Sequence, residues 1–318
     1  MKEFIKLCKK TKQELKKYLK NELKKYYKEV IDEDGFLYVK GSEIALTAHM
    51  DTTPHVEYGN RKRVKNVKIT AIKNKTIVSA REGIGGDDRC GIYIIMKLLK
   101  ETDLRPTIVF CEDEEIGLVG SRKFTKTKYI NDLKKMYYII QIDRRGSEDI
   151  VFYDDENEEF HEYVAEITGY KEAIGSCSDI SNLCPQCGIA GVNISCGYYN
   201  EHSMSEYVVI EEMENTYEKV KKLTEEGLKR GISYEYVEKV YFGNYWYEDT
   251  YLEVTFDNGK GDAGTEYFVG ESIADVWYQF LAEHPRLTMK DVKDFDEGIL
   301  TEDDYKELEE MKGYGYIV

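Results

Sequence analysis

Short apolar runs recur along the first two thirds of the chain, and polar turns or amphipathic stretches separate them. Runs of this kind that are rich in β-branched residues predict buried strands. They occur at residues 36–39, 44–48, 107–111, 137–142, 150–153, 164–167 and 191–196, and an alternating hairpin pattern covers 66–80. Helical spacing predicts helices at about 2–30, 92–99, 121–126 and 210–228, with a short one near 180. Alternating strands and helices predict an α/β fold with a central mixed β-sheet flanked by helices on both faces.

The composition changes near residue 233, where tyrosine, tryptophan and acidic residues become frequent. Strands are predicted at 237–247, 250–256 and 265–269, and helices at 272–283 and 302–312. We therefore expect two domains. Residues 1–232 form the large α/β domain, and residues 233–318 form a small α+β appendage of unknown role.

The net charge of the 318-residue chain is −16, from 45 basic and 61 acidic residues. Residues 235–318 contain 21 of the acids and 7 of the bases, so most of the excess lies in the appendage. This charge argues against nucleic acid as a partner. No stretch is apolar enough to predict a membrane span, and the basic N-terminus lacks the apolar core of a secretory signal. Seven scattered cysteines fit reduced thiols, so we expect a cytoplasmic protein.

Histidine and acidic side chains follow several predicted strands, at the edge of the sheet where α/β proteins build their sites. Mixed histidine and carboxylate ligands suit zinc or a similar divalent ion, and a shared carboxylate can bridge two ions. Each motif alone has a simpler interpretation, namely a hydrogen-bonded histidine, a helix start or a solvated acidic turn. The candidate residues are His49, Asp51, Asp87, Glu114, Glu115, Asp143 and His202.

Taken together, these motifs resemble those of the co-catalytic zinc exopeptidases, the superfamily of peptidase T, zinc aminopeptidases and glutamate carboxypeptidases. The segment from His49 to Thr52 matches the HMDT of the peptidase T branch. Residues 85–91 are similar to the GADDxAG element, and residues 114–121 match EExGLxGS of the aminopeptidase branch. The resemblance covers roughly residues 1–230. It implies a zinc-peptidase-like three-layer sandwich.

The resemblance also implies a dinuclear centre with two zinc ions per chain, or cobalt or manganese in their place. His49 and Asp143 would bind one ion, Glu115 and His202 would bind the other, and Asp87 would bridge both.

Two further residues receive catalytic roles from the resemblance. Asp51 would orient His49, and Glu114 would act as the general base and acid. Adjacent side chains on an extended chain point in opposite directions, so Glu115 could bind metal while Glu114 stays free. Glu112 and Asp113 are then turn residues.

One departure from the family limits what can be carried over. Many of its members insert a lid domain between the last acidic ligand and the last histidine, but Asp143 and His202 are only 59 residues apart. The chain therefore resembles the compact, lidless aminopeptidases. Ser178 and Asp179 occupy the place of a family element near the substrate, and a simple helix start is an equally good interpretation.

These observations predict metal-dependent hydrolysis of an amide or peptide bond, most simply by an aminopeptidase that acts on peptides. A deacylase or carboxypeptidase acting on N-acyl amino acids or small amides is the alternative. A binding protein that kept the fold without activity is a further one. The sequence leaves the oligomeric state open.

Overall fold

The computed structural model describes residues 1–53, 63–239, 250–259, 261, 263–270, 276, 279–280, 283–284, 286–287 and 291–299. The chain divides into two compact units, Met1–Lys239 and Val240–Val318. Tyr234, at the change in composition, is buried in the core of the first unit. Among the described residues, no helix has the length and apolar character needed to cross a membrane.

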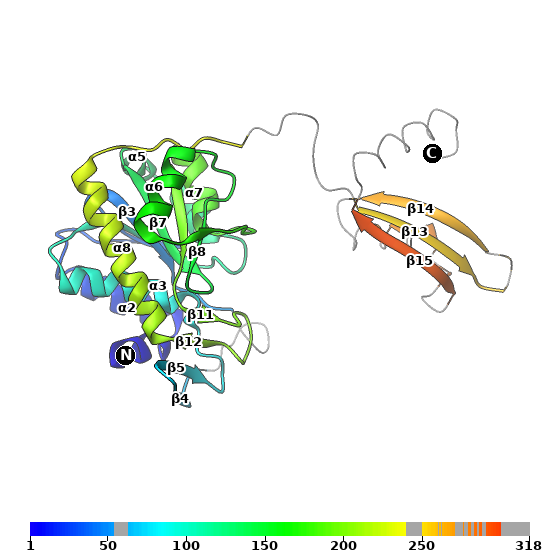
Figure 1. Ribbon diagram of the computed structural model, residues 1–318, viewed down its shortest axis with the longest axis horizontal. Helices are drawn as coiled ribbons and strands as arrows, with labels where there is room; N and C mark the ends of the chain where they lie inside the picture. Colours follow the sequence, from blue (N-terminus) through cyan, green and yellow to red (C-terminus); the bar gives the residue numbers. More distant parts are fainter. Residues whose placement is uncertain are drawn as a thin grey trace. The chain divides into compact units, whose positions relative to one another are not determined.

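The first unit alternates helices and strands (Figure 1). Its helices are α1 (Lys2–Cys8), α2 (Lys12–Leu23), α3 (Gly86–Glu101), α4 (Val119–Thr125), α5 (Ile130–Leu133), α6 (Glu158–Thr168), α7 (Asp179–Cys187) and α8 (Ile210–Arg230). Its strands are β1 (Ile31–Glu33), β2 (Phe36–Val39), β3 (Ser42–His49), β4 (Val67–Ile72), β5 (Lys75–Ala80), β6 (Pro106–Cys111), β7 (Tyr138–Arg144), β8 (Asp149–Val151), β9 (Lys171–Glu172), β10 (Gly191–Ser195), β11 (Tyr198–Tyr199) and β12 (Tyr207–Val209).

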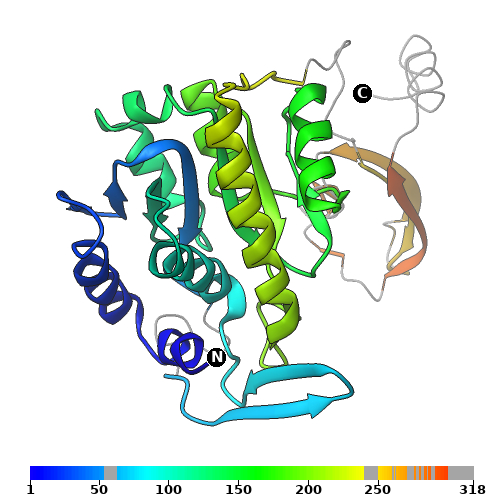
Figure 2. The same cartoon turned by 60° about the vertical axis from the view of Figure 1, so that its left-hand side comes forward.

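The main sheet is mixed and has the strand order β1-β2-β6-β3-β7-β10-β8-β9. Its central strands β6, β3, β7 and β10 are parallel. A second, antiparallel sheet has the order β11-β12-β5-β4. Helices α3 and α8 pack against one face of the main sheet, and α4 and α7 pack against the other. Figure 2 shows α8 as the long yellow-green helix that runs along one face of the main sheet. The predicted α/β sandwich is therefore confirmed.

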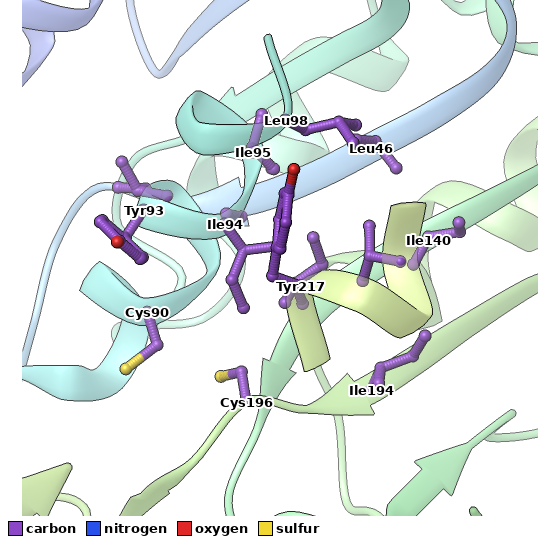
Figure 3. Close-up of a cluster of buried hydrophobic side chains, with 14 of the residues drawn as sticks. Leu46, Cys90, Tyr93, Ile94, Ile95, Leu98, Ile140, Ile194, Cys196 and Tyr217 are labelled. Carbon is purple, nitrogen blue, oxygen red and sulfur yellow. The ribbon is translucent and has the colours of Figure 1, made fainter. Parts of the chain in front are cut away.

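Apolar residues fill both spaces between the sheet and its helices. Figure 3 shows the first space, where Leu46 of β3 and Ile140 of β7 lie near Leu98 of α3 and Tyr217 of α8. The opposite face of β3 contributes Ala45 to the second core cluster. Burying a side chain of leucine size stabilises the fold by about 1.5–3 kcal/mol. Successive side chains of β3 point to opposite faces of the sheet, so the strand packs against both helix layers.

The N-terminal basic segment forms two helices rather than the single predicted one. Thr11 begins α2 with a capping box, in which Glu14 N donates to the Thr11 hydroxyl and Thr11 N donates to Glu14. Lys12 and Lys16 then form ion pairs with Asp113 and Glu112, each at 2.6 Å. The basic helix therefore neutralises the first half of the acidic turn.

The strand predicted at residues 164–167 is wrong, because this segment lies inside α6. Asn157 accepts from Phe160 N at the start of the helix, and Gly169 ends it with a φ of 68°. Phe160, Tyr163 and Val164 form one buried helical face, with the i, i+3, i+4 spacing of an amphipathic helix. Val164 and Ile167 are β-branched, which is why a short strand is predicted here from the sequence.

The second unit contains an antiparallel sheet of order β14-β13-β15. Its strands are β13 (Thr250–Asp257), β14 (Ala263–Gly270) and β15 (Val292–Ile299). The first two were predicted, but β15 was missed because acidic residues interrupt its apolar pattern. The predicted helix at 302–312 and most of the predicted elements at 237–247 and 272–283 lie outside the described residues.

The close packing of α8 on the sheet gives a first testable prediction. A Cβ added at Gly227 would collide with the hydroxyl of Tyr138, which donates to the carbonyl of Leu223 at 2.7 Å. Replacing glycine by alanine in a helix normally stabilises it by about 0.5–1 kcal/mol. Here overpacking should outweigh that gain, so we expect Gly227→Ala to lower the free energy of unfolding by about 1–3 kcal/mol in urea denaturation. Lys222→Ala, at an exposed position of the same helix, is the matched control and should change it little.

Candidate metal centre

The candidate residues gather at the point of the main sheet where the connections from adjacent parallel strands run in opposite directions. From β3 the chain passes to β6 on one side and then to β7 on the other side of β3. Loops that leave adjacent parallel strands in opposite directions open a crevice at their carboxyl ends. His49 ends β3, Asp143 lies near the end of β7, and Glu114 and Glu115 follow β6. The topology therefore brings together residues that are far apart in the sequence.

His49 lies at the bottom of this crevice and is almost completely buried. Its Nε2 is 2.8 Å from Asp87 Oδ1, 3.3 Å from Asp143 Oδ1 and 4.0 Å from Glu114 Oε2. One imidazole nitrogen thus faces three carboxyl groups from three different segments.

His202 forms the second half of the cluster. Its Nε2 lies 2.8 Å from Glu115 Oε2 and 3.2 Å from Asp87 Oδ2. Asp87 therefore presents one carboxylate oxygen to each histidine, which is the arrangement that a bridging ligand requires. His202 follows β11 and lies in its connection to β12, within the second sheet.

The backbone around Asp87 is held by buried side chains. Asp87 and Asp88 have non-helical dihedral angles, so regular helix begins only after them. Asp88 accepts from Gly91 N at 2.9 Å, as a helix cap does, and from His49 N at 3.1 Å. Glu206, also buried, accepts from Gly85 N at 2.6 Å and Asp87 N at 3.0 Å.

Asp51 connects His49 to the acidic turn. Its two carboxylate oxygens accept from Glu114 N and Glu115 N, both at 3.2 Å. Oδ1 lies 3.5 Å from His49 Nδ1, which is long for a hydrogen bond. Glu114 and Glu115 are not in extended chain, since Leu118 N closes a turn onto Glu114 O. The two side chains nevertheless diverge, each toward a different histidine.

Ser178 and Asp179 have different surroundings. Ser178 is buried, and its hydroxyl donates to Asp143 Oδ2 at 2.8 Å. Asp179 is fully buried on the first turn of α7. Burial raises the pKa of Asp179 to about 6. Only Ser178 of this pair lines the cavity described below.

Burial and mutual repulsion change the acidity of the cluster in the metal-free chain. Burial, joined by the charges of Asp143 and Asp87, raises the pKa of Glu114 to about 9, although His49 opposes this. Burial likewise raises the pKa of Asp143 to about 7. Hydrogen bonds to Asp87 and Glu115 raise the pKa of His202 to about 11. The crowded carboxylates therefore draw protons in the absence of another cation.

His49 and Asp87, by contrast, are both held in their charged forms. Burial lowers the pKa of His49, but Asp143, Asp51 and Asp87 more than reverse this and hold it well above its ordinary value. Burial favours the neutral form of Asp87, but hydrogen bonds with His202 and His49 keep its pKa below the usual range.

This donor set fits divalent metal ions. Ligand atoms of His49, Asp87 and Glu115 lie within 4.8 Å of one another, as do those of His49, Asp88 and Asp143. Nitrogen and carboxylate donors at this spacing suit zinc and related ions. A third group, Glu266, Glu283 and His284, meets the same criterion in the second unit, where His284 Nε2 lies 2.6 Å from Glu266.

Five residues of the cluster line a small polar cavity of about 130 Å³, namely Asp87, Glu114, Glu115, Asp143 and His202. The cavity is also lined by Arg144, Arg145, Tyr153 and Tyr198, and the segment 175–178 is part of its wall. Two larger cavities, of about 610 and 640 Å³, lie elsewhere on the first unit and contain none of the candidate ligands.

Sequence reasoning missed several buried residues that support the cluster. Gln141 donates to Asp143 Oδ2 at 3.0 Å, and its position two residues earlier on β7 could have indicated a shared face. Arg89 donates to the carbonyls of Met50 and Asp51, at 2.9 and 3.2 Å. Glu206 carried no local signal, because its partners are about 120 residues away.

Comparison with solved structures shows what the chain is similar to. Aminopeptidase PepT from Bacillus cereus matches with a TM-score of 0.54 and 18% identity, over 71% of this chain and 97% of that chain. The aminopeptidase APDkam598 from the archaeon Desulfurococcus kamchatkensis matches with a TM-score of 0.51 and 17% identity, over 72% and 99%. PhTET1-12s, described as a dodecamer, matches with a TM-score of 0.51 and 16% identity, over 70% and 98%.

The chain has the fold of these peptidases. No protein-family model and no curated protein sequence matches it. The structural likeness therefore establishes the fold alone, and the activity has to be argued from the site.

The protonation of the histidines gives a second prediction. A histidine binds metal through a neutral nitrogen, whereas the pKa values of His49 and His202 are raised in the metal-free chain. Zinc binding should therefore release protons, and its affinity should keep rising with pH up to about 11, where His202 loses its proton in the metal-free chain.

Calorimetric titration of the metal-free protein in buffers of different ionisation enthalpy measures this release. His161→Gln, a change outside the cluster, should leave it unaltered. Identical heats in all buffers would show that both histidines are already neutral before metal binds.

Proposed function

We propose that the protein is a metal-dependent hydrolase of peptide or amide bonds, and that it acts as an aminopeptidase. The observation that carries the proposal is the pairing of His49 and His202 across Asp87, with a separate carboxyl group, Glu114, at the edge of the pair. Similarity in fold to aminopeptidases supports it.

In this proposal His49 and Asp143 hold one zinc ion, Glu115 and His202 hold the other, and Asp87 bridges them. Two such ions, when bound, polarise a carbonyl group and make water more acidic. Asp51 fixes the backbone of the acidic turn relative to His49, so that the two halves of the ligand set keep their spacing.

Glu114 supplies the proton transfer. It is mostly buried, it lines the cavity, and no hydrogen bond occupies its carboxyl group among the described residues. Cations at the ligand cluster would lower its raised pKa, because they remove the repulsion that disfavours its charge. Glu114 can then accept a proton from the attacking water and return it to the leaving amine.

The charge of the cavity favours a substrate with a free amine. Four candidate carboxylates, Asp87, Glu114, Glu115 and Asp143, line the cavity, and Glu201 beside them is paired with Arg145. A protonated α-amino group would be attracted to this acidic lining, which is the physical basis for preferring an aminopeptidase.

The alternative, a deacylase or carboxypeptidase on N-acyl amino acids, is favoured by a different observation. Arg144 and Arg145 line the same cavity immediately after Asp143. Arginine binds carboxylates well, so it could hold a substrate that ends in one. Arg145 is already paired with Glu201 at 2.7 Å, which weakens this alternative.

Two broader expectations follow. All seven cysteines are free, which fits a reducing compartment such as the cytoplasm. The similar PhTET1-12s is described as a dodecamer, and this supports an oligomer here as well.

The role of Glu114 gives the third prediction. We expect Glu114→Gln to keep both metal ions and to lose at least ~10²-fold in kcat, because the amide can neither accept nor return the proton. Metal content by mass spectrometry and hydrolysis of amino-acid anilides measure the two effects. Asp113→Asn, which alters the neighbouring acid paired with Lys12, is the control. Near-normal activity of Glu114→Gln would remove Glu114 from its role.

Substrate preference gives the fourth prediction. Wild-type protein loaded with zinc should hydrolyse leucine anilide and an unblocked dipeptide at least ~10-fold faster, by kcat/KM, than the same compounds with an acetylated amine. A preference for the acetylated compounds would favour the deacylase. Failure to hydrolyse any amide with full metal content would favour a binding protein.

A further inference from the structure

Two buried neighbours hold one carboxylate oxygen of Asp143 through hydrogen bonds of ordinary length. Oδ2 accepts from Gln141 Nε2 at 3.0 Å and from the Ser178 hydroxyl at 2.8 Å. Gln141 Nε2 also donates to Ser178 Oγ at 2.5 Å, which closes a triangle of three hydrogen bonds. Gln141 and Ser178 are at most 2% exposed, so water does not compete for these bonds.

The orientation of the Gln141 amide is fixed by chemistry. Ile180 N lies 2.9 Å from Oε1 of Gln141, and a backbone N–H can only donate. Oε1 must therefore face α7, and the two hydrogens of Nε2 must face Ser178 and Asp143. Ser178 accepts one of them and donates its own hydrogen to Asp143.

The other oxygen of Asp143 points into the cluster. Oδ1 lies 3.3 Å from His49 Nε2 and accepts a long hydrogen bond from the Tyr198 hydroxyl at 3.4 Å. With Oδ2 already taken by two donors, Asp143 has one oxygen for a metal ion. Asp87 differs, because each of its oxygens faces a different histidine.

We propose that Gln141 and Ser178 are positioning residues that lock Asp143 as a ligand through Oδ1 alone. This inference rests on the proposed dinuclear centre. The two donors stabilise the charged form of Asp143 and prevent rotation of its carboxylate, which would otherwise move Oδ1 away from His49. Ser178 thereby acts on the metal ion through Asp143, instead of binding substrate.

A purely structural role would give a different result. If the triangle only satisfied buried polar groups, removing one member would lower the stability of the metal-free protein and leave metal affinity unchanged. If it positions Asp143, the same change weakens one metal site. Affinity therefore separates the two roles without depending on turnover.

The experiment titrates metal-free protein with zinc by calorimetry, using competing chelators, in wild type, Ser178→Ala, Gln141→Met and the double variant. We expect each single variant to weaken one of the two sites about 10–100-fold and to leave the other unchanged. The double variant should lose less than the product of both effects, because both donors act on the same oxygen. Ser178→Thr, which keeps the hydroxyl, should restore affinity toward the wild-type value.

Ser176→Ala is the matched control, since Ser176 is exposed and lines the same cavity. Circular dichroism of each metal-free variant verifies folding, and Ser178→Ala alone decides the question if Gln141→Met does not fold. Wild-type affinity at both sites in Ser178→Ala would overturn the positioning role while the hydrolase proposal stands. Wild-type protein that binds no zinc would overturn the hydrolase proposal itself.

Discussion

The negative charge gathered at the carboxyl ends of β3, β6 and β7 is the constraint on which the rest of this structure depends. Asp87, Glu114 and Asp143 all lie within 4.0 Å of one buried imidazole nitrogen, that of His49. Burying unpaired carboxylates is costly unless cations or protons compensate for them. Burial, joined by repulsion from neighbouring carboxylates, keeps the pKa values of Glu114 and Asp143 above their usual range although His49 opposes it.

The four consecutive acids after β6 are divided between two tasks. Glu112 and Asp113 turn toward the N-terminal helix, where Lys16 and Lys12 neutralise them. Glu114 and Glu115 turn toward the histidines. A basic helix at the start of the chain thus removes two charges from the vicinity of the site, so that fewer carboxylates remain for metal ions to balance. The proposed metal centre and the packing of α2 are therefore parts of one electrostatic arrangement.

Much of this could be predicted from the sequence, because apolar periodicity identifies buried strands and polar residues at their ends mark a site. The helix α6 was mistaken for a strand, since a short apolar run fits both periods. The second sheet, which carries the loop of His202, was not predicted, because pairing between β11, β12 and β5 is a long-range property. Gln141 was overlooked because an amide inside a strand has no motif of its own.

The location of His202 on the second sheet has a consequence for local stability. His49, Asp87 and Asp143 are buried at the main sheet, whereas the side chain of His202 is 52% exposed and belongs to the short connection between β11 and β12. Exposed connections between short strands open at lower free energy than a central parallel sheet. A fluctuation that frays this connection removes one histidine while the other stays in place. The two histidines therefore differ in how firmly the fold holds them, and backbone amide hydrogens should exchange faster around His202 than in β3.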